Sequence, residues 1–222
     1  MKHVFTVLIL NLFALPAIAQ IAPNRTEISA YSGLHRAVHF DDAPEIQRLI
    51  AQGADLEARD NHGRTAVHIA AFASNENALR LLAAAGSDMN ALEDQAYDVV
   101  TIAAVANDPE MMVLALELGN RPDLITSPYI GTALIAAAHL GHVQVVRILA
   151  NGGAPLDHIN NLGWTALIEA VILGDGGPDH IATVEILLVA GADRDITDDA
   201  GVSPLQHALE RGYGEIASLL QP

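Results

Sequence analysis

The sequence predicts an all-α protein in which short helices stack as repeated units. Two sequence elements recur in step along the chain, and each unit carries an aliphatic stripe at helical spacing. The first element is a glycine turn at residues 53, 86, 119, 153 and 191, at intervals of 33, 33, 34 and 38 residues. A period of this length is typical of a solenoid of helix pairs.

The second element is a Thr-Ala-Leu-like segment upstream of each glycine. Its clearest copies are Thr65–Ala71, Thr132–Ala138, Thr165–Val171 and Ser203–Leu209. The first alanine of each unit precedes the turn glycine by 16 residues in four copies (37 to 53, 70 to 86, 103 to 119 and 137 to 153). Two motifs held at one distance in four copies define one repeating helix-turn-helix unit.

Each part of the unit has a physical role. The leading Thr or Ser can accept hydrogen bonds from the free N–H groups of a helix start. Alanines let two helices approach closely. Stripes such as Ile46, Leu49 and Ile50 give the second helix one apolar face. Glycine then supplies a left-handed cap that ends the helix.

These motifs resemble the ankyrin repeat family, whose unit carries Thr-Pro-Leu-His-x-Ala-Ala, Gly-His, Val-Val-x-x-Leu-Leu and Gly-Ala-Asp. Residues 141–149 follow the second half closely, and the resemblance covers residues 28–221. It implies an ankyrin-repeat solenoid of helix-turn-helix units with short finger loops. We predict a signal peptide over 1–19 and an ankyrin domain over 20–222, with approximate repeats 28–60, 61–93, 94–126, 127–160, 161–198 and a truncated 199–222.

The middle of the array departs from the pattern. Ala96 stands where a finger glycine belongs, Asn107-Asp108-Pro109 replaces Gly-His, and Pro128 is an extra finger residue. We therefore expect the junction over residues 94–131 to be the least stable part of the stack.

The N-terminus reads as a secretory signal. Lys2 and His3 precede an apolar stretch, and Ala17-Ile18-Ala19 matches a small-x-small cleavage site, so cleavage is expected between Ala19 and Gln20. The stretch 4–19 is shorter than the roughly 20 residues that span a bilayer. We predict a periplasmic protein without a stable membrane anchor, with secretion as the alternative.

Composition narrows the function. The net charge is −16, which argues against nucleic acid as a partner because phosphate binding needs a basic face. The chain has no cysteine, which excludes disulfides and thiolate chemistry. No cofactor is expected.

The resemblance implies a protein partner held by the finger tips and the concave face of the first helices. The candidate partner-binding residues are Tyr31, Arg64, Phe72, Tyr97, Tyr129, His139 and Trp164. Aromatic and arginine side chains dominate interface energetics, but bulky residues at the finger position can also shield the finger's own backbone. Acidic finger residues are either solvated or steer a basic partner.

The predicted function is a non-catalytic, monomeric protein-interaction module. The narrower alternative is a specific inhibitor, immunity or stress-protection factor for one exported enzyme. An enzyme is least favoured: it would need a metal or small-molecule pocket built from His139, His142 and Asp175, and no His-Glu-x-x-His motif is present. The insertion 174–180 reads as a lengthened loop, with partner contact as the alternative.

Overall fold

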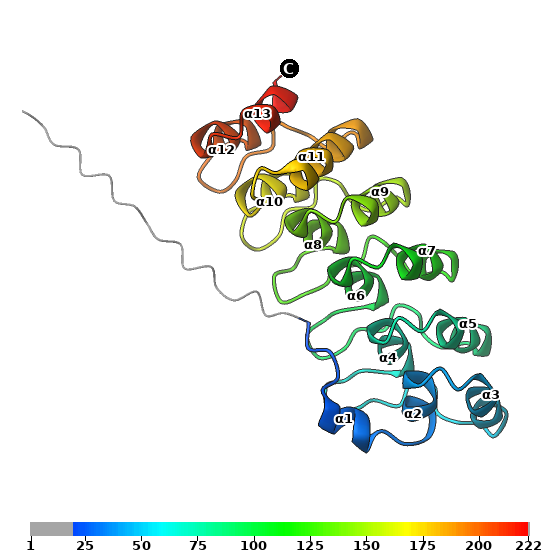
Figure 1. Cartoon of the computed structure of the whole chain (residues 1–222). Coiled ribbons are helices and arrows are strands. Elements are labelled where there is room, and N and C mark those ends of the chain that lie inside the picture. The colour runs from blue at the N-terminus through cyan, green and yellow to red at the C-terminus, as the bar shows by residue number, and fades with distance from the viewer. Residues whose placement is uncertain (1–19, 222) are drawn as a thin grey trace, which may run out of the picture.

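The protein is a stack of six antiparallel helix pairs preceded by one short helix, α1 (Arg25–Ala30) (Figure 1). The computed structural model describes residues 20–221, so the predicted signal peptide, with Ala19 at its end, lies outside it. The described part has no strand, only an isolated bridge between Thr126 and Gly131. The predicted all-α class is confirmed.

The two helices of each pair occupy separate layers. The inner helices are α2 (Gly33–His39), α4 (Ala66–Phe72), α6 (Val99–Ala106), α8 (Ala133–Leu140), α10 (Ala166–Ile172) and α12 (Pro204–Arg211). The outer helices are α3 (Ala43–Ala51), α5 (Glu76–Ala85), α7 (Pro109–Glu117), α9 (Val143–Asn151), α11 (Pro178–Ala190) and α13 (Gly214–Leu220). The sixth pair is thus complete in its helices, although its copy is short.

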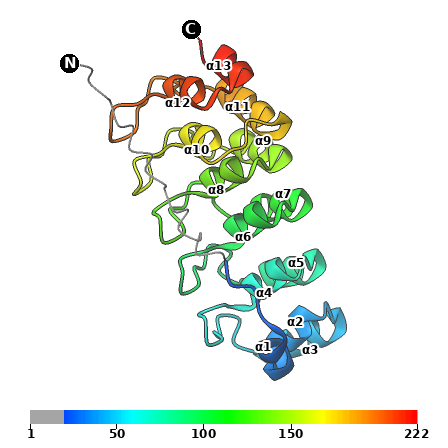
Figure 2. The same cartoon turned by 60° about the vertical axis from the view of Figure 1, so that its left-hand side comes forward.

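Five finger loops join successive pairs and project in a row from the side of the inner helices (Figure 2). They are finger 1 (54–64), finger 2 (87–97), finger 3 (120–131), finger 4 (154–164) and finger 5 (192–202). Each inner helix packs against the next inner helix. Among residues 20–221, no helix is long and apolar enough to cross a membrane.

The predicted Thr or Ser stands at the N-cap of α4, α8, α10 and α12, and Ser32 and Asp98 take the same position before α2 and α6. Thr132 Oγ1 accepts from Ile135 N–H at 3.3 Å, and Thr165 Oγ1 accepts from Ile168 N–H at 3.2 Å. These bonds satisfy N–H groups that a helix start leaves free.

The inner helices also end alike. One or two residues after each of five inner helices, a residue has positive φ, at Asp41, Ser74, Asn107, Gly141 and Gly212. The following N–H then bonds back to the first alanine of the unit, as from His142 N–H to Ala137 O at 3.0 Å. This closing turn directs the chain into the outer helix.

The outer helices are followed by the predicted left-handed glycines, including Gly86 (φ 94°) and Gly119 (φ 95°). In the two irregular copies, other residues take this conformation in the fingers. Ala96 has φ 60° in finger 2, and Ser127 (φ 68°) and Ile130 (φ 54°) share the role in finger 3. A β-branched residue at positive φ is a true outlier.

The core lies between the layers and is mainly aliphatic. Fully buried side chains include Ile46, Leu79, Ile102, Met111, Leu134, Leu149 and Leu167. Two of the candidate partner-binding residues, Tyr31 and Tyr97, are buried, so the expectation that they meet a partner at the surface is wrong. Both belong to the hydrophobic core cluster.

The insertion 174–180 lengthens the loop and the start of α11. His180 Nε2 lies 3.0 Å from the His139 carbonyl oxygen in the previous unit, and Tyr213 Oη donates to Gly174 O at 3.0 Å from the next unit. The loop therefore braces three consecutive units. Its contact with a partner stays an open alternative.

Candidate functional site

The row of fingers is held rigid by one side chain in each of four fingers. In finger 1, Asp60 Oδ1 accepts from the N–H groups of His62 and Arg64 at 2.8 and 3.0 Å. The same bonds to the second and fourth following residues occur at Glu93, Asn160 and Asp198. These four residues therefore shape the finger backbone.

Sequence reasoning missed this role, although a signal exists. Each of the four residues lies five positions before the helix-capping residue: 60 before 65, 93 before 98, 160 before 165 and 198 before 203. A short acceptor at a fixed offset from a cap is typical of a closed turn.

Backbone hydrogen bonds join neighbouring fingers. Asp94 N–H donates to His62 O at 3.1 Å, and Ser127 N–H donates to Ala96 O at 3.0 Å. Asn161 N–H donates to Tyr129 O at 3.0 Å. Fingers 1 to 4 therefore form a continuous edge, and side chains along it keep fixed relative positions.

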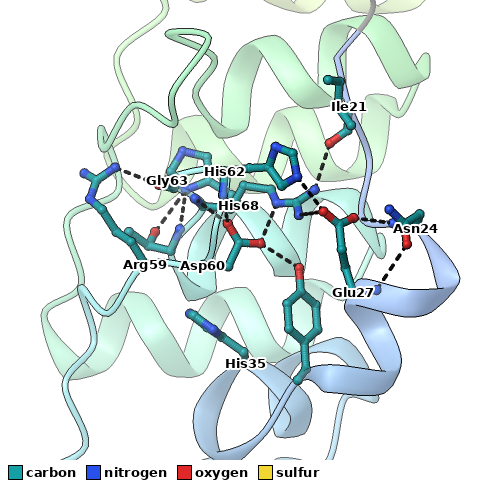
Figure 3. Close-up of polar contacts among 12 residues, drawn as sticks. Ile21, Asn24, Glu27, His35, Arg59, Asp60, His62, Gly63 and His68 are labelled. Atoms are coloured by element: carbon teal, nitrogen blue, oxygen red, sulfur yellow. Dashed lines mark hydrogen bonds and ion pairs between the residues drawn. The ribbon is translucent and has the colours of Figure 1, made fainter.

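The N-terminal arm (residues 20–30) covers the first finger. Arg64 has no exposed surface, because its Nη1 donates to Ile21 O at 2.9 Å and its Nε donates to Asp60 Oδ2 at 2.7 Å (Figure 3). Its Nη2 lies 3.1 Å from Glu27 Oε1, an ion pair without hydrogen-bond geometry. The expectation that Arg64 is a surface residue is wrong, since the arm satisfies its charge internally.

Carboxylates hold this arm through charge. Burial would raise the pKa of Glu27, but the Asn24 N–H and the charges of Arg64 and His62 outweigh it and hold the pKa below its ordinary value. Burial would also raise the pKa of Asp60, but hydrogen bonds from the His62 and Arg64 N–H groups outweigh it. The pKa of Asp60 is therefore below its ordinary value. Both groups are therefore ionised at neutral pH and fix the arm electrostatically.

Tyr31 is buried by the same network. Its hydroxyl donates to Asp60 Oδ2 at 2.9 Å, and burial first, then this bond, raises the pKa of the phenol. Tyr97, two units further along, is also buried. The structure thus favours the interpretation that these bulky residues shield finger backbone, with Tyr31 at finger 1 and Tyr97 at the end of finger 2.

The remaining candidates are partly exposed. Tyr129 lies in finger 3, Trp164 closes finger 4, and Phe72 ends α4 with one side packed on the core. His139 lies on α8 beside Glu169 of α10, with 3.6 Å between Nδ1 and Oε2. Tyr129, Trp164 and His139 belong to adjacent units, whereas Phe72 lies two units earlier.

Two of the histidines make hydrogen bonds within the stack. His68 Nδ1 accepts from Thr65 N–H at 3.1 Å, and burial lowers the pKa of the His68 imidazole to about 4. His142 Nδ1 lies 2.8 Å from Ala104 O, and Asp175 faces His180 rather than His139. In residues 20–221, no three His, Asp or Glu side chains gather as a metal-binding group.

Stacked helix pairs with an ordered row of fingers define a repeat scaffold that presents a surface rather than an enclosed cavity. A family model described as ankyrin repeats (3 copies) matches residues 9–93 and 100–193. The chain belongs to the ankyrin repeat family.

Known proteins similar to this chain include bacterial ones. The putative ankyrin repeat protein YahD of Escherichia coli K12 is 33% identical over 186 residues, 83% of this chain and 92% of that protein. A solved ankyrin repeat domain from Acinetobacter baumannii AYE is 41% identical with a TM-score of 0.80, covering 84% of this chain and 95% of that one.

A more distant likeness is to a chain in the complex of the Bdellovibrio bacteriovorus predatory endopeptidase Bd0816 with the immunity protein Bd3460. The identity is 20%, the TM-score is 0.70, and the match covers 86% of this chain and 97% of that one. At this identity the likeness concerns the fold alone.

Proposed function

We propose that the chain is a non-catalytic module of an exported compartment that binds one protein partner through its fingers and concave helix face. The observation that carries this is the finger row, whose members are joined by backbone hydrogen bonds between units. Such an edge loses little conformational entropy when it binds, because its backbone is already ordered.

The place of the contact follows from exposure. The arm covers finger 1, and Tyr31, Arg64 and Tyr97 are buried. Tyr129, Trp164 and His139 stay partly open in the fourth and fifth units. We therefore assign the partner contact to the C-terminal half of the concave side.

Affinity capture tests the binding proposal. The chain beginning at Gln20 would be immobilised and exposed to periplasmic extract of its host, beside a Trp164→Ala, Tyr129→Ala double variant. We expect one stoichiometric partner on the first and a weakened complex on the second. Equal capture by both proteins would show that the contact lies at other residues. Failure to capture any saturable partner would contradict the proposal.

Export needs its own test. The sequence features of residues 1–19 support cleavage before Gln20 and a periplasmic destination, with secretion as the alternative. Expression of the full chain in a Gram-negative host, followed by fractionation and intact mass, should give a periplasmic species that begins at Gln20. A cytoplasmic species of full length would contradict this.

An inhibitor, immunity or stress-protection factor is a narrower form of the same proposal. It requires that the captured partner be an enzyme and that an equimolar amount of this chain abolish its activity. An unaffected enzyme, or a partner without activity, would leave the broader binding proposal standing alone.

A further inference from the structure

Exposed aliphatic side chains gather on two neighbouring fingers. Ile125 and Ile130 of finger 3 are 44% and 53% exposed, and Ile159 and Leu162 of finger 4 are 48% and 41% exposed. We call these four residues the apolar ridge. Scattered exposed aliphatics are ordinary, but a group on adjacent loops marks an interaction surface.

Hydrogen bonds between the two fingers make the ridge continuous. His158 Nε2 of finger 4 lies 2.7 Å from Ile130 O of finger 3, so the chain next to Ile159 is held against the chain at Ile130. Asn161 N–H bonds to Tyr129 O at 3.0 Å, which brings Leu162 to the same edge. One side-chain bond and one backbone bond therefore hold the two fingers of the ridge in a fixed arrangement.

Other fingers carry different chemistry at the same positions. Arg59 and His62 of finger 1 correspond to Ile159 and Leu162, and Thr197 and Ala200 correspond to them in finger 5. In finger 1 these two polar side chains have partners within the protein. Arg59 Nη1 donates to Gly63 O at 2.7 Å, and His62 is paired with Glu27. Finger 2 carries Leu92, which is partly buried, and Gln95 at these positions. Exposed large aliphatic residues in the five fingers are therefore confined to fingers 3 and 4.

The backbone at Ile130 is also strained. At φ 54° a β-branched side chain costs on the order of 1 to 3 kcal/mol, and its side chain is half exposed. Core packing does not account for an isoleucine at such a position.

Acidic side chains border the ridge. Asp123 and Asp157 are exposed in fingers 3 and 4, and the Asp199 carboxylate lies against Gly163, where an added Cβ would be 2.6 Å from its Cγ. Arg121 beside them is paired with Asp123 at 2.9 Å. The whole chain carries a net charge of −16, so the ridge lies in a negative field.

We propose that the apolar ridge docks a protein segment whose aliphatic side chains are flanked by lysine or arginine. The aliphatic residues would cover the ridge, and the basic flanks would meet its acidic border. This rests on the proposed function and adds the partner's chemistry and the two fingers that select it.

Labelled peptides test the proposal on the chain beginning at Gln20. One peptide alternates leucine with serine between arginine flanks, and its matched control has glutamate flanks. We expect the arginine-flanked peptide to bind at least about tenfold more tightly, and its affinity to fall as salt rises. Equal affinity for both peptides would overturn the proposal.

Variants locate the contact. Ile130→Asp with Ile159→Asp should weaken the arginine-flanked peptide about tenfold or more. Aspartate tolerates positive φ, so Ile130→Asp should fold, and circular dichroism would check this. The matched control, Val113→Asp with Val189→Asp, changes exposed aliphatics on the outer helices α7 and α11 and should leave binding unchanged.

A third variant separates this inference from the broader function. Leu140→Asp with Leu173→Asp alters exposed residues at the ends of α8 and α10, away from the ridge. Loss of binding here but not in the ridge variant would overturn the ridge and leave a protein-binding function. Binding by neither peptide, together with failure to capture any partner, would count against both.

Discussion

Arg64 and Glu27 form an ion pair between the first finger and the N-terminal arm, with 3.1 Å between Nη2 and Oε1. Helix α1 contains no buried residue, so polar contacts rather than core packing hold much of the arm in place. The arm and the first finger are coupled through one guanidinium.

We predict that Arg64→Met destabilises the chain by about 3 kcal/mol, because it leaves the Asp60 and Glu27 carboxylates without their counter-charge. Urea unfolding would measure this. Arg48→Met is the matched control, since Arg48 pairs with Glu45 on the exposed surface, and it should leave stability nearly unchanged. Equal effects would show that burial of Arg64 contributes nothing.

His68 makes stability depend on pH. Its folded pKa is about 4, below the ordinary value of about 6.5, because burial disfavours the charged ring. The unfolded chain therefore takes up the proton first. The neutral His68 ring makes its full contribution to stability above about pH 6.5. This contribution is lost as the pH falls toward 4, and the free energy of unfolding falls by about 3 kcal/mol.

The matched variant is His68→Gln, since Gln206 fills the same position in the sixth unit and accepts from Ser203 N–H at 2.9 Å. Denaturant titrations between pH 7 and 4 should show a flatter pH dependence in this variant. An unchanged slope would assign the acid loss to other groups.

Asp98 caps the start of α6, but one of its two carboxylate oxygens is buried without a hydrogen-bond partner among the described residues. Its Oδ1 accepts from Thr101 N–H at 2.8 Å, but its buried Oδ2 has no hydrogen-bond partner among the described residues. Burial raises the pKa of Asp98, so the charged form opposes folding at neutral pH. Asp98→Thr, the residue in three other units, should stabilise by about 1 to 3 kcal/mol at pH 7.

The sign of this effect can be checked with pH. The penalty is absent below the ordinary aspartate pKa of about 3.9 and grows as the pH rises through the folded value. The advantage of Asp98→Thr should therefore shrink toward pH 4. A constant advantage would point to packing instead of charge.

We predict that replacing Ala96 by glycine stabilises the chain. At φ 60° its Cβ costs about 1 to 2 kcal/mol, and Ala96→Gly should raise the unfolding midpoint, as measured by thermal denaturation. Gly86→Ala is the reverse control: it has φ 94° and open space around an added Cβ, so it tests conformation without a clash and should destabilise.

The junction over residues 94–131 should open first. The outer helices α5 and α7 are in less extensive contact than the other consecutive outer pairs, which agrees with the weak motifs there. Hydrogen exchange should show faster exchange in α6 and α7 than in α8 and α10. Uniform protection along the stack would exclude a weak centre.

Sequence alone was sufficient for the fold because the repeat is a local code. Caps, alanines and turn glycines act over a few residues, so Thr132, Ala137 and Gly119 could be placed without any distant contact. The identity of the ankyrin family followed from the same motifs.

Tertiary structure decided which candidate residues face solvent. Tyr31, Arg64 and Tyr97 have the composition of an interface, yet their burial depends on contacts made after folding, such as Arg64 with Glu27, 37 positions earlier in the chain. The repeat pattern of the sequence does not indicate that the N-terminal arm folds back over the first finger. The apolar ridge arises likewise, because Ile130 and Ile159 come together only when adjacent units stack and their fingers bond.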